Sequence, residues 1–469
     1  MPDKTRLPIA VFQKMRRLTT ADNATPIDQR IKFLKALRAG IFANQAALKS
    51  ALDADFNGRS AHETLLADIM PTIGAIDYSL GHLRKWMRPQ KRHVAMHFLP
   101  AKNRVELVPK GVVLIISPWN YPVSLSILPM VSALAAGNRV ILKPSEYTPR
   151  TSNIIAQLVA DALPCDRATV LTGGAEVSQQ LCALPFDHIL FTGSGETGRK
   201  VMAAAAQNLT PVTLELGGKS PAIIHPDYDL AKAVGRIVRG KLINAGQTCI
   251  APDYVMVAAN RINEFVDLYK QTVERFYPQI AENPDYSAII NKTHFQRLNG
   301  LLDDAEQKGA RVLALGAKKT RHSGDRKLHP HLVLDVKDSM NIASQEIFGP
   351  VLPVIPFEKV EQASSYINQR PRPLALYYFD QNSARVKKFL GATISGTAAI
   401  NDTVLQFVQD DLPFGGTGPS GMGKCHGAEG FREFSHARSV FYQARLNSSV
   451  LLDPPYGRIF DKITRFLVR

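Results

Sequence analysis

The feature of this sequence that most constrains its fold is an alternation of short apolar runs and helical segments that begins at Gly111. Val112–Ile116 is a continuous apolar run, which is typical of a parallel strand covered on both faces. A predicted helix over Leu125–Ala136 follows and ends at Gly137. Units of this length predict a doubly wound parallel sheet that binds ligands at the carboxyl ends of its strands. Further strands are predicted at 140–142, 169–171 and 189–191, and further helices at 152–163, around 182 and at 196–208.

A second series of units follows Gly218. It comprises predicted strands over Ala222–Ile224 and Tyr254–Ala258, an amphipathic helix ahead of Cys249 and a helix over Ile262–Phe276. The fold class that we expect is therefore α/β, with two doubly wound domains stacked around a crevice. The cysteine of the second domain would then face the ligand of the first.

The two ends of the chain differ from this pattern. Residues 1–88 are predicted to be helical, because apolar residues recur at helical spacing between 34 and 48, and Ser60–Glu63 matches a capping box. The polar, glycine-rich stretch 413–430 is expected to form an arm or an interface and no part of the core.

Composition bounds the class of protein. With 469 residues, of which 45% are hydrophobic and 21% charged, the chain is expected to be an ordinary soluble protein of two or three domains. Its four cysteines are scattered, which favours a reducing, cytoplasmic compartment over a disulfide framework. Neither an apolar signal segment nor a run of membrane-spanning length is evident.

The net charge of +16 raises the question of nucleic-acid binding. Basic residues cluster at 84–92 and 318–327, but neither cluster lies in a recognisable nucleic-acid-binding module. We interpret both clusters as solvated faces and expect no nucleic-acid partner. The histidines show no metal-ligand spacing, so no metal site is expected either.

Cys249 lies in the small turn Asn244–Ile250, between a predicted helix and a predicted strand. A free thiol with a pKa near 8.5 is only a few per cent thiolate at neutral pH, yet it is intrinsically very nucleophilic. Neighbouring dipoles or cations would increase the thiolate fraction. The alternative is a buried structural cysteine, which is the commoner situation.

Several other strand ends carry groups that suit chemistry. Glu215 lies between two leucines, where apolar surroundings would raise its pKa toward that of a general base. Asn120, between two prolines, could donate N–H bonds to an oxyanion. Thr192–Gly198 contains the pattern GxGxxG before a helix, which suits a phosphate, although it follows the fourth strand and not the first. Glu215 lies seventeen positions after Gly198, but we reject the ribose-ligand role that this spacing would give it.

Taken together, the motifs PWNYP, KPSE, FTGSGETG, LELGGKSP, NAGQTCIAPDYV, EIFGPVLPV and PFGGTGPSGMGKCHGAEGFREFSH resemble the aldehyde dehydrogenase superfamily in order and spacing. The resemblance runs from about Ile27 to Tyr442. Within the superfamily the chain is most similar to the class 3 branch and, in that branch, to coniferyl aldehyde dehydrogenases. One departure is Gly195, where the family usually has threonine.

The resemblance implies a role for each matching residue. Cys249 would be the nucleophile, Asn120 the oxyanion donor and Glu215 the base. The cofactor-binding residues would be Lys143 and Glu146 at the adenosine ribose, Gly193, Ser194 and Gly198 at the pyrophosphate, and Glu346 and Phe348 at the nicotinamide ribose. Tyr121, beside Asn120, would line the substrate pocket.

The resemblance also implies an organisation. Residues 1–89 and 108–216 would form the dinucleotide-binding domain, and residues 217–401 the catalytic domain. Segments 90–107 and 402–448 would form an oligomerisation element that supports a homodimer. Residues 449–469 would form a C-terminal tail.

The implied function is NAD(P)-dependent oxidation of an aromatic or medium- to long-chain apolar aldehyde to the carboxylic acid, through a thiohemiacetal and a thioester on Cys249. Glu146 favours NAD, because a carboxylate accepts ribose hydroxyls and repels a 2′-phosphate, although the class 3 branch often tolerates NADP. Two alternatives remain: an acylating enzyme that passes the thioester to coenzyme A, and a non-catalytic relative that binds nucleotides.

The tail contains a short amphipathic pattern at 458–469. A helix of this length needs a surface on which to bury its apolar face. We expect it to form a lid over the chain's own substrate mouth, and the alternative is peripheral contact with an anionic membrane. The apolar face comprises Ile459, Phe460, Ile463, Phe466 and Leu467.

Overall fold

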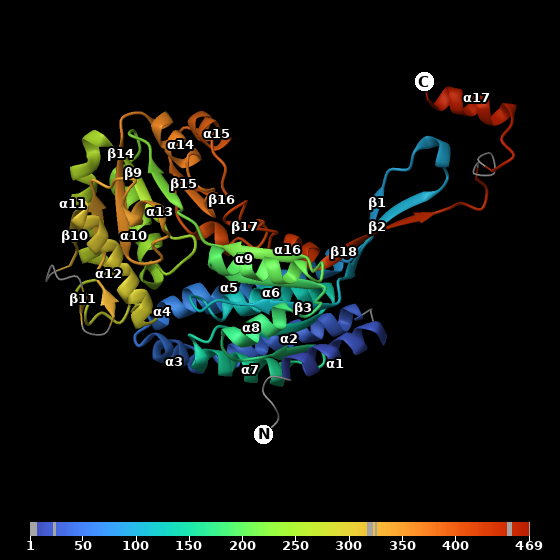
Figure 1. Ribbon diagram of the computed structural model, residues 1–469, viewed down its shortest axis with the longest axis horizontal. Helices are drawn as coiled ribbons and strands as arrows, with labels where there is room; N and C mark the ends of the chain where they lie inside the picture. Colours follow the sequence, from blue (N-terminus) through green and yellow to red (C-terminus); the bar gives the residue numbers. More distant parts are fainter. Residues whose placement is uncertain (1–6, 22–24, 317–321, 324–325, 448–452, 469) are drawn as a thin grey trace.

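A computed structural model describes residues 7–21, 25–316, 322–323, 326–447 and 453–468. Three main sheets organise these residues (Figure 1). Two are the cores of stacked α/β layers, and the third projects from them as an arm. The α/β fold with two doubly wound domains, expected from the sequence, is confirmed.

The first sheet has six strands in the order β17-β7-β6-β3-β4-β5, all parallel except β17. Its strands are β3 (Val112–Ile116), β4 (Arg139–Lys143), β5 (Ala168–Val170), β6 (His188–Gly193), β7 (Val212–Leu216) and β17 (Gly421–Met422). Its helices are α1 (Leu7–Ala21), α2 (Ile27–Ala43), α3 (Gln45–Phe56), α4 (Ala61–Thr64), η1 (Leu65–Ile69), α5 (Met70–Trp86), α6 (Ser124–Ala136), α7 (Pro149–Ala162), α8 (Ala175–Cys182), α9 (Gly195–Ala206) and α16 (Gly427–Glu433).

Strand β3 shows why this sheet is covered on both faces. Successive side chains of a strand point to opposite faces. Val113 and Ile115 pack with residues of α2, α3, α5, α6 and α7, whereas Val112, Leu114 and Ile116 pack with residues of α1, α8 and α9. A run of five buried apolar residues is therefore required.

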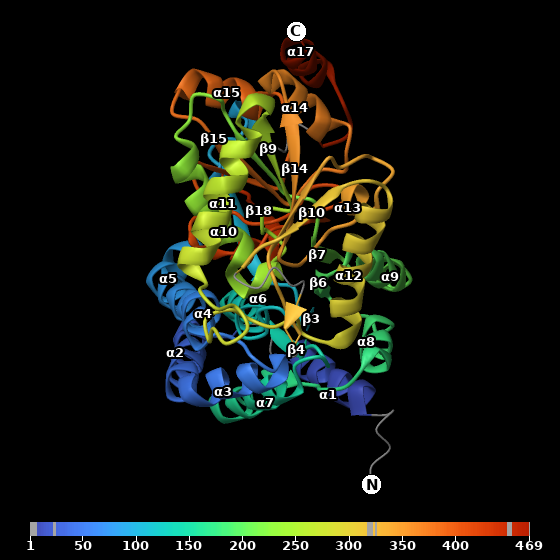
Figure 2. The ribbon, with the colours of Figure 1, turned by 90° about the vertical axis from the view of Figure 1, so that its left-hand side faces the viewer.

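The second sheet has seven strands in the order β10-β13-β14-β9-β8-β15-β16, all parallel except β10. Residues of α10, α11 and α12 pack on one face, and residues of α14 and α15 on the other (Figure 2). The strands are β8 (Pro221–Ile224), β9 (Tyr254–Ala258), β10 (Arg311–Ala314), β13 (His331–Leu334), β14 (Val351–Phe357), β15 (Ala375–Phe379) and β16 (Thr397–Ile400). The helices are α10 (Leu230–Leu242), η3 (Ile243–Gly246), η4 (Ala259–Arg261), α11 (Ile262–Phe276), α12 (Lys292–Gln307), α13 (Asn341–Ser344), α14 (Val360–Asn368), α15 (Ser383–Gly391) and η5 (Leu405–Val408), and a separate ribbon pairs β11 (His322–Ser323) with β12 (Lys327–Leu328).

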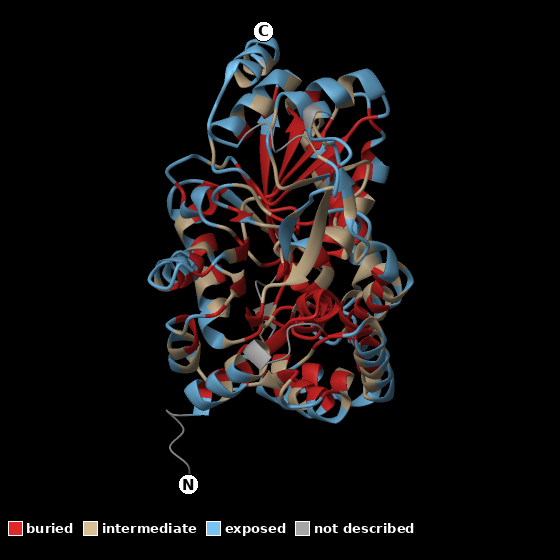
Figure 3. Cartoon of the chain, turned by 90° about the vertical axis from the view of Figure 1, so that its right-hand side faces the viewer, coloured by how far each residue is buried: buried red, intermediate tan, exposed pale blue. Residues whose placement is uncertain are grey.

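The arm is an antiparallel sheet in the order β1-β2-β18. It is formed by β1 (Gln90–Arg92), β2 (Lys102–Pro109) and β18 (Ser435–Tyr442), with η2 (Met96–Phe98) between the first two strands. Unlike the inner strands of the two core sheets, those of the arm are mostly intermediate or exposed (Figure 3).

Helix α17 (Arg458–Leu467) confirms the amphipathic helix predicted at the C-terminus. It lies beyond the far end of β1 and β2, on the opposite side of the molecule from the second sheet (Figure 1). Ile459 and Phe466, on its apolar face, are 66% and 78% exposed. The expected lid over the chain's own substrate mouth is therefore wrong for this chain.

The strand–helix units predicted from the sequence are confirmed, with small shifts at their ends. The expectation that 413–430 forms no part of the core is wrong, because β17 and α16 both belong to the first α/β layer. The basic cluster at 84–92 is largely exposed, whereas most of the cluster at 318–327 lies outside the described residues. Among the described helices, none is long and apolar enough to cross a membrane.

Candidate active site

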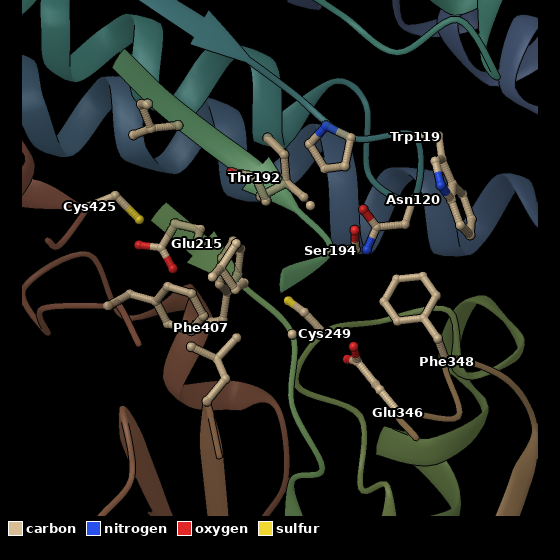
Figure 4. A pocket seen from close by; sticks show the side chains of 18 of the residues that line it. Trp119, Asn120, Thr192, Ser194, Glu215, Cys249, Glu346, Phe348, Phe407 and Cys425 are labelled. Carbon is tan, nitrogen blue, oxygen red and sulfur yellow. The ribbon is translucent and has the colours of Figure 1, made fainter. Parts of the chain in front are cut away.

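A cavity of about 330 Å³ lies where the two α/β layers meet, and both contribute to its walls. Seven of the predicted site residues line it: Asn120, Gly193, Ser194, Glu215, Cys249, Glu346 and Phe348 (Figure 4). The cavity is also lined by side chains for which the sequence had indicated no place there, among them Trp119, Leu125, Leu128, Pro129, Thr192, His294, Arg297, Phe407, Phe414, Cys425 and His426.

The first sheet positions the cavity at its topological switch point. Strands β4 and β5 lie on one side of β3, and β6 and β7 lie on the other. In such sheets the loops at the carboxyl ends of the two strands at the reversal diverge and leave a crevice. The loop after β3 carries Trp119 and Asn120, and Gly193 and Ser194 end β6 and open α9, so both flank this crevice.

The turn before Cys249 has an unusual backbone. Asn244, Ala245 and Gly246 have φ angles of 51°, 50° and 75°, so the chain reverses sharply after α10. A side chain at Gly246 would place its Cβ 2.4 Å from the carbonyl oxygen of Gly349. Glycine is therefore required where this turn meets the segment that carries Glu346 and Phe348.

Buried charged groups from α4 and the loop before it form hydrogen bonds with this turn. The Glu63 carboxylate accepts a 2.9 Å hydrogen bond from the backbone N–H of Asn244. Arg59 donates to the carbonyl oxygen of Asn120 at 2.6 Å and to the side-chain oxygen of Asn244 at 3.2 Å. The turn before Cys249 and the backbone of Asn120 are thus held by one buried network.

The side-chain amide of Asn120 lies against the same turn. Its Nδ2 donates to the carbonyl oxygen of Gln247 at 3.2 Å, while Nδ2 of Asn244 donates to the carbonyl oxygen of Asn120 at 3.0 Å. Tyr121 is not among the residues that line the cavity. Its hydroxyl is 2.6 Å from the hydroxyl of Thr248, so it contacts the turn from within the core.

Glu215 is buried on β7, as its apolar sequence neighbours predicted. Neither carboxylate oxygen is bonded to an N–H or O–H group of the described residues. Burial raises the pKa of Glu215 to about 8, and contact with the Cys425 thiol offsets this only in part. The group is therefore poised to exchange a proton near neutral pH.

The thiol of Cys249 is more weakly acidic than the sequence suggested. Burial raises its pKa to about 12, and the neighbouring carboxyl groups of Glu346 and Glu215 act in the same direction. The expectation that neighbouring groups increase the thiolate fraction of Cys249 is therefore wrong for the chain without bound ligands. If this sulfur is to act as a nucleophile, a proton acceptor has to take the thiol proton.

The opposite side of the cavity carries Glu346 and Phe348 (Figure 4). Burial raises the pKa of Glu346 to about 7. Arg297 donates to its backbone carbonyl at 3.1 Å, and a Cβ on Gly217 would lie 2.0 Å from its carboxylate. Phe348 packs edge-on against Trp119, with ring centroids 5.4 Å apart.

The remaining predicted cofactor residues lie along the first sheet. Ser194 caps α9, accepting a 3.3 Å bond from the backbone N–H of Thr197. Gly198 lies where a Cβ would be 2.7 Å from a methyl of Leu216. Lys143, at the end of β4, donates to Glu146 at 2.7 Å, and neither residue lines the cavity.

These features fit a dinucleotide. A helix N-terminus with exposed N–H groups opens at the switch point, where a pyrophosphate would lie. The Lys143–Glu146 pair lies at the end of the adjacent strand β4, and the Glu346 carboxylate faces the glycine at 217 across a space too small for a side chain.

The aldehyde dehydrogenase family model matches residues 10–440. The chain is 50% identical to a probable coniferyl aldehyde dehydrogenase of Pseudomonas aeruginosa over 97% of this chain and 94% of that protein. It is 39% identical to aldehyde dehydrogenase family 3 member A2 of Macaca fascicularis over 94% and 90% of the two chains.

Solved structures agree. The substrate-bound state of Staphylococcus aureus AldH matches with a TM-score of 0.92 and 35% identity, over 98% of this chain and 99% of that one. An NAD+ complex of an aldehyde dehydrogenase from Bacillus cereus matches with a TM-score of 0.85 and 27% identity, over 94% and 89%. This chain therefore belongs to the aldehyde dehydrogenase family and is an NAD(P)-dependent aldehyde dehydrogenase.

Proposed function

We propose that the protein oxidises apolar aldehydes, aromatic ones in particular, to carboxylic acids by way of a thioester on Cys249. The observation that carries the proposal is the meeting of Cys249, Glu215 and Asn120 in one cavity. The cavity walls next to them are apolar, with Leu125, Phe407 and Phe414 among their residues. The name of the Pseudomonas aeruginosa relative, a probable coniferyl aldehyde dehydrogenase, points to the same class of substrate.

In this proposal each of these three residues carries out a different part of the reaction. Sγ of Cys249 adds to the aldehyde carbon, and Glu215, which lines the same cavity, takes the thiol proton. The Asn120 amide and the Cys249 backbone N–H stabilise the resulting oxyanion, each by roughly 3–4 kcal/mol in comparable sites. NAD, when bound, supplies the hydride acceptor. Glu215 then activates the water that hydrolyses the thioester, which releases the acid.

We propose NAD as the preferred nicotinamide cofactor. Glu146 lies at the end of β4, where a carboxylate accepts the ribose hydroxyls and repels a 2′-phosphate. Lys143, which donates to Glu146 at 2.7 Å, holds that carboxylate in place. NADP is expected to be accepted less well.

The test is to measure kcat/KM for benzaldehyde, coniferyl aldehyde and a series of alkanals, each with NAD and with NADP, and to identify the product. The proposal expects the acid as product, higher values for aromatic and longer apolar aldehydes than for acetaldehyde, and higher values with NAD. An acyl-coenzyme A product would instead favour the acylating alternative, and no turnover across the panel would favour a non-catalytic role.

The domain roles and the assembly are part of the same proposal. We assign 1–89 with 108–216 to cofactor binding, 217–401 to catalysis, and 90–107 with 402–448 to oligomerisation. Strand β17, within the last segment, also extends the first sheet. The arm ends in the edge strands β1 and β18, and an edge strand offers unpaired backbone groups to a second copy, which supports a homodimer.

A further inference from the structure

We propose that Glu433 is a positioning residue for the base Glu215: a chain of hydrogen bonds holds its carboxylate near that base, and this negative charge sets the pH range in which the enzyme turns over. The inference rests on the role proposed for Glu215 and concerns a residue outside the cavity. Glu433 is the last residue of α16, and it does not line the cavity.

Four side chains from separate segments form this chain of hydrogen bonds. The Thr213 hydroxyl, on β7, donates to Oε1 of Glu433 at 2.5 Å. Nε2 of His188, at the start of β6, is 2.8 Å from the same hydroxyl, and Nζ of Lys110, between β2 and β3, is 3.0 Å from Nδ1 of His188. His188 and Thr213 are buried, whereas the Glu433 side chain is 25% exposed.

The direction of each hydrogen bond follows from what each group can donate. The Lys110 ammonium group only donates, so Nδ1 of His188 accepts, and the neutral imidazole carries its hydrogen on Nε2. That N–H donates to Thr213, whose one hydroxyl hydrogen is then left for Glu433. Burial lowers the pKa of His188 to about 3, which agrees with a neutral ring. The chain therefore ends on an accepting carboxylate oxygen, and it fixes the place of that negative charge.

Thr213 lies on the same face of β7 as Glu215. Successive side chains of a strand point to opposite faces, and Leu214 and Leu216 pack with residues of α1, α8 and α9. Thr213 and Glu215 therefore share the other face, which Phe431 of α16 covers. Positions two residues apart in a strand are roughly 7 Å apart. A carboxylate bonded to Thr213 is thus held within one such step of the base.

The segment after β17 leaves room for this carboxylate against β7. A Cβ on Gly423 would lie 2.7 Å from Oε1 of Glu433 and 2.8 Å from Oγ1 of Thr213. Gly423 also has a φ of 78°, so both the backbone and the close approach require glycine. The absence of a side chain at this position allows Glu433 to reach Thr213.

The other charges near the two carboxyl groups favour this role. Burial raises the pKa of Glu215 most, the Cys425 thiol lowers it, and Glu433 raises it further. At the far end of the chain, burial lowers the pKa of Lys110 and Glu433 opposes that effect. Because like charges disfavour each other's ionisation, loss of the Glu433 charge should make Glu215 more acidic. The other titratable groups that line the cavity are Cys249, His294, Arg297, Glu346, Cys425 and His426.

The experiment measures kcat from pH 6 to 10 with NAD and benzaldehyde for the full-length wild type and for Glu433→Gln. Glutamine keeps an acceptor oxygen for Thr213, so the hydrogen bonds remain and only the charge is lost. The midpoint of the rise in kcat should move to lower pH by roughly 0.5–1 unit, the size expected for charges about 7 Å apart at a partly exposed site. Below both midpoints kcat follows the ionised fraction of Glu215, so the variant should turn over roughly 3–10 times faster than the wild type at pH 6. A merely structural role would lower kcat at every pH.

The matched control is Glu429→Gln, which removes the same charge from the same helix. Glu429 bonds to Arg432 at 2.7 Å on the surface, and its loss should leave the midpoint unchanged. An unchanged midpoint in Glu433→Gln, a shift to higher pH, or an equal shift in Glu429→Gln would overturn the inference. If the glutamine variant does not fold, Glu433→Ala removes the same charge and should shift the midpoint in the same direction. A wild-type kcat that does not rise with pH would instead contradict the role proposed for Glu215 itself.

Discussion

Glu63 and Asn244 lie 181 positions apart in the sequence, and the Glu63 carboxylate accepts a 2.9 Å hydrogen bond from the backbone amide of Asn244. Ser287 donates to the same carboxylate oxygen at 3.0 Å. The helical segment at the N-terminus therefore helps to shape the turn that presents Cys249. Burial also raises the pKa of Glu63 to about 7.

Replacing Glu63 by leucine should remove the hydrogen bond between this side chain and the backbone of Asn244. The backbone N–H of Asn244 would be left buried and unpaired, at a cost of roughly 1–3 kcal/mol in the free energy of unfolding. We expect kcat to fall about tenfold or more, because the turn would no longer hold Cys249 in place. Urea unfolding and steady-state kinetics measure the two effects. Glu63→Gln keeps an acceptor oxygen and serves as the control, and equal behaviour of the two variants would argue against the role of the carboxylate.

The pH dependence of turnover should reflect Glu215. Its pKa is raised to about 8, so the carboxylate form that acts as a base is the minor form at pH 7 and dominates above pH 8. When hydrolysis of the thioester limits turnover, kcat should therefore rise with pH through about pH 8 and then level off. A profile of kcat from pH 6 to 10 tests this. A kcat that is flat or falls across that range would contradict the assignment.

Two glycines should respond in opposite ways to substitution by alanine. Gly246→Ala meets both a φ of 75° and the oxygen of Gly349 at 2.4 Å, so it should destabilise the fold by roughly 1–3 kcal/mol. Gly195, at the first position of α9, has open space around it, so Gly195→Ala should stabilise by roughly 0.4–1 kcal/mol. Thermal or urea unfolding of both variants checks the signs, and equal effects would show that the strain at Gly246 is misjudged.

Deletion of residues 457–469 should not change aldehyde selectivity within a single chain, because no residue of α17 lines the cavity. The apolar face of α17 is instead available to an anionic membrane, through an amphipathic attachment that does not span it. We therefore expect truncation to abolish binding to anionic vesicles and to leave the ratio of KM values for a long alkanal and acetaldehyde unchanged. A changed ratio with unaffected vesicle binding would contradict both expectations.

The fold was predictable because its strands are covered on both faces. Val112–Ile116 has no polar position, and only a doubly covered strand requires that composition. The segment 413–430 was not predictable, because its glycines serve close packing and not flexibility. A Cβ on Gly421 would lie 2.1 Å from the carbonyl oxygen of Leu214, in the strand beside β17.

The site was predictable only where chemistry and local sequence coincide. Glu215 could be identified because the leucines on either side of it indicate that it is buried. Glu63 could not, because the capping box places its backbone N–H correctly against Ser60 but says nothing of its carboxylate. The carboxylate of Glu63 contacts the backbone of Asn244 only in the folded chain. His426 likewise gave no local indication, since its aromatic neighbours come from separate segments.

In the proposed reaction Cys249 carries the acyl group, and Glu215 is needed to remove it. The most direct measurement is mass spectrometry of Glu215→Gln after mixing with NAD and an aromatic aldehyde, alongside the optical signal of reduced cofactor. We expect about one equivalent of reduced cofactor in a burst, little turnover afterwards, and the acyl mass on the peptide that contains Cys249. Full steady-state turnover, or an acyl mass on the peptide that contains Cys425 instead, would contradict it.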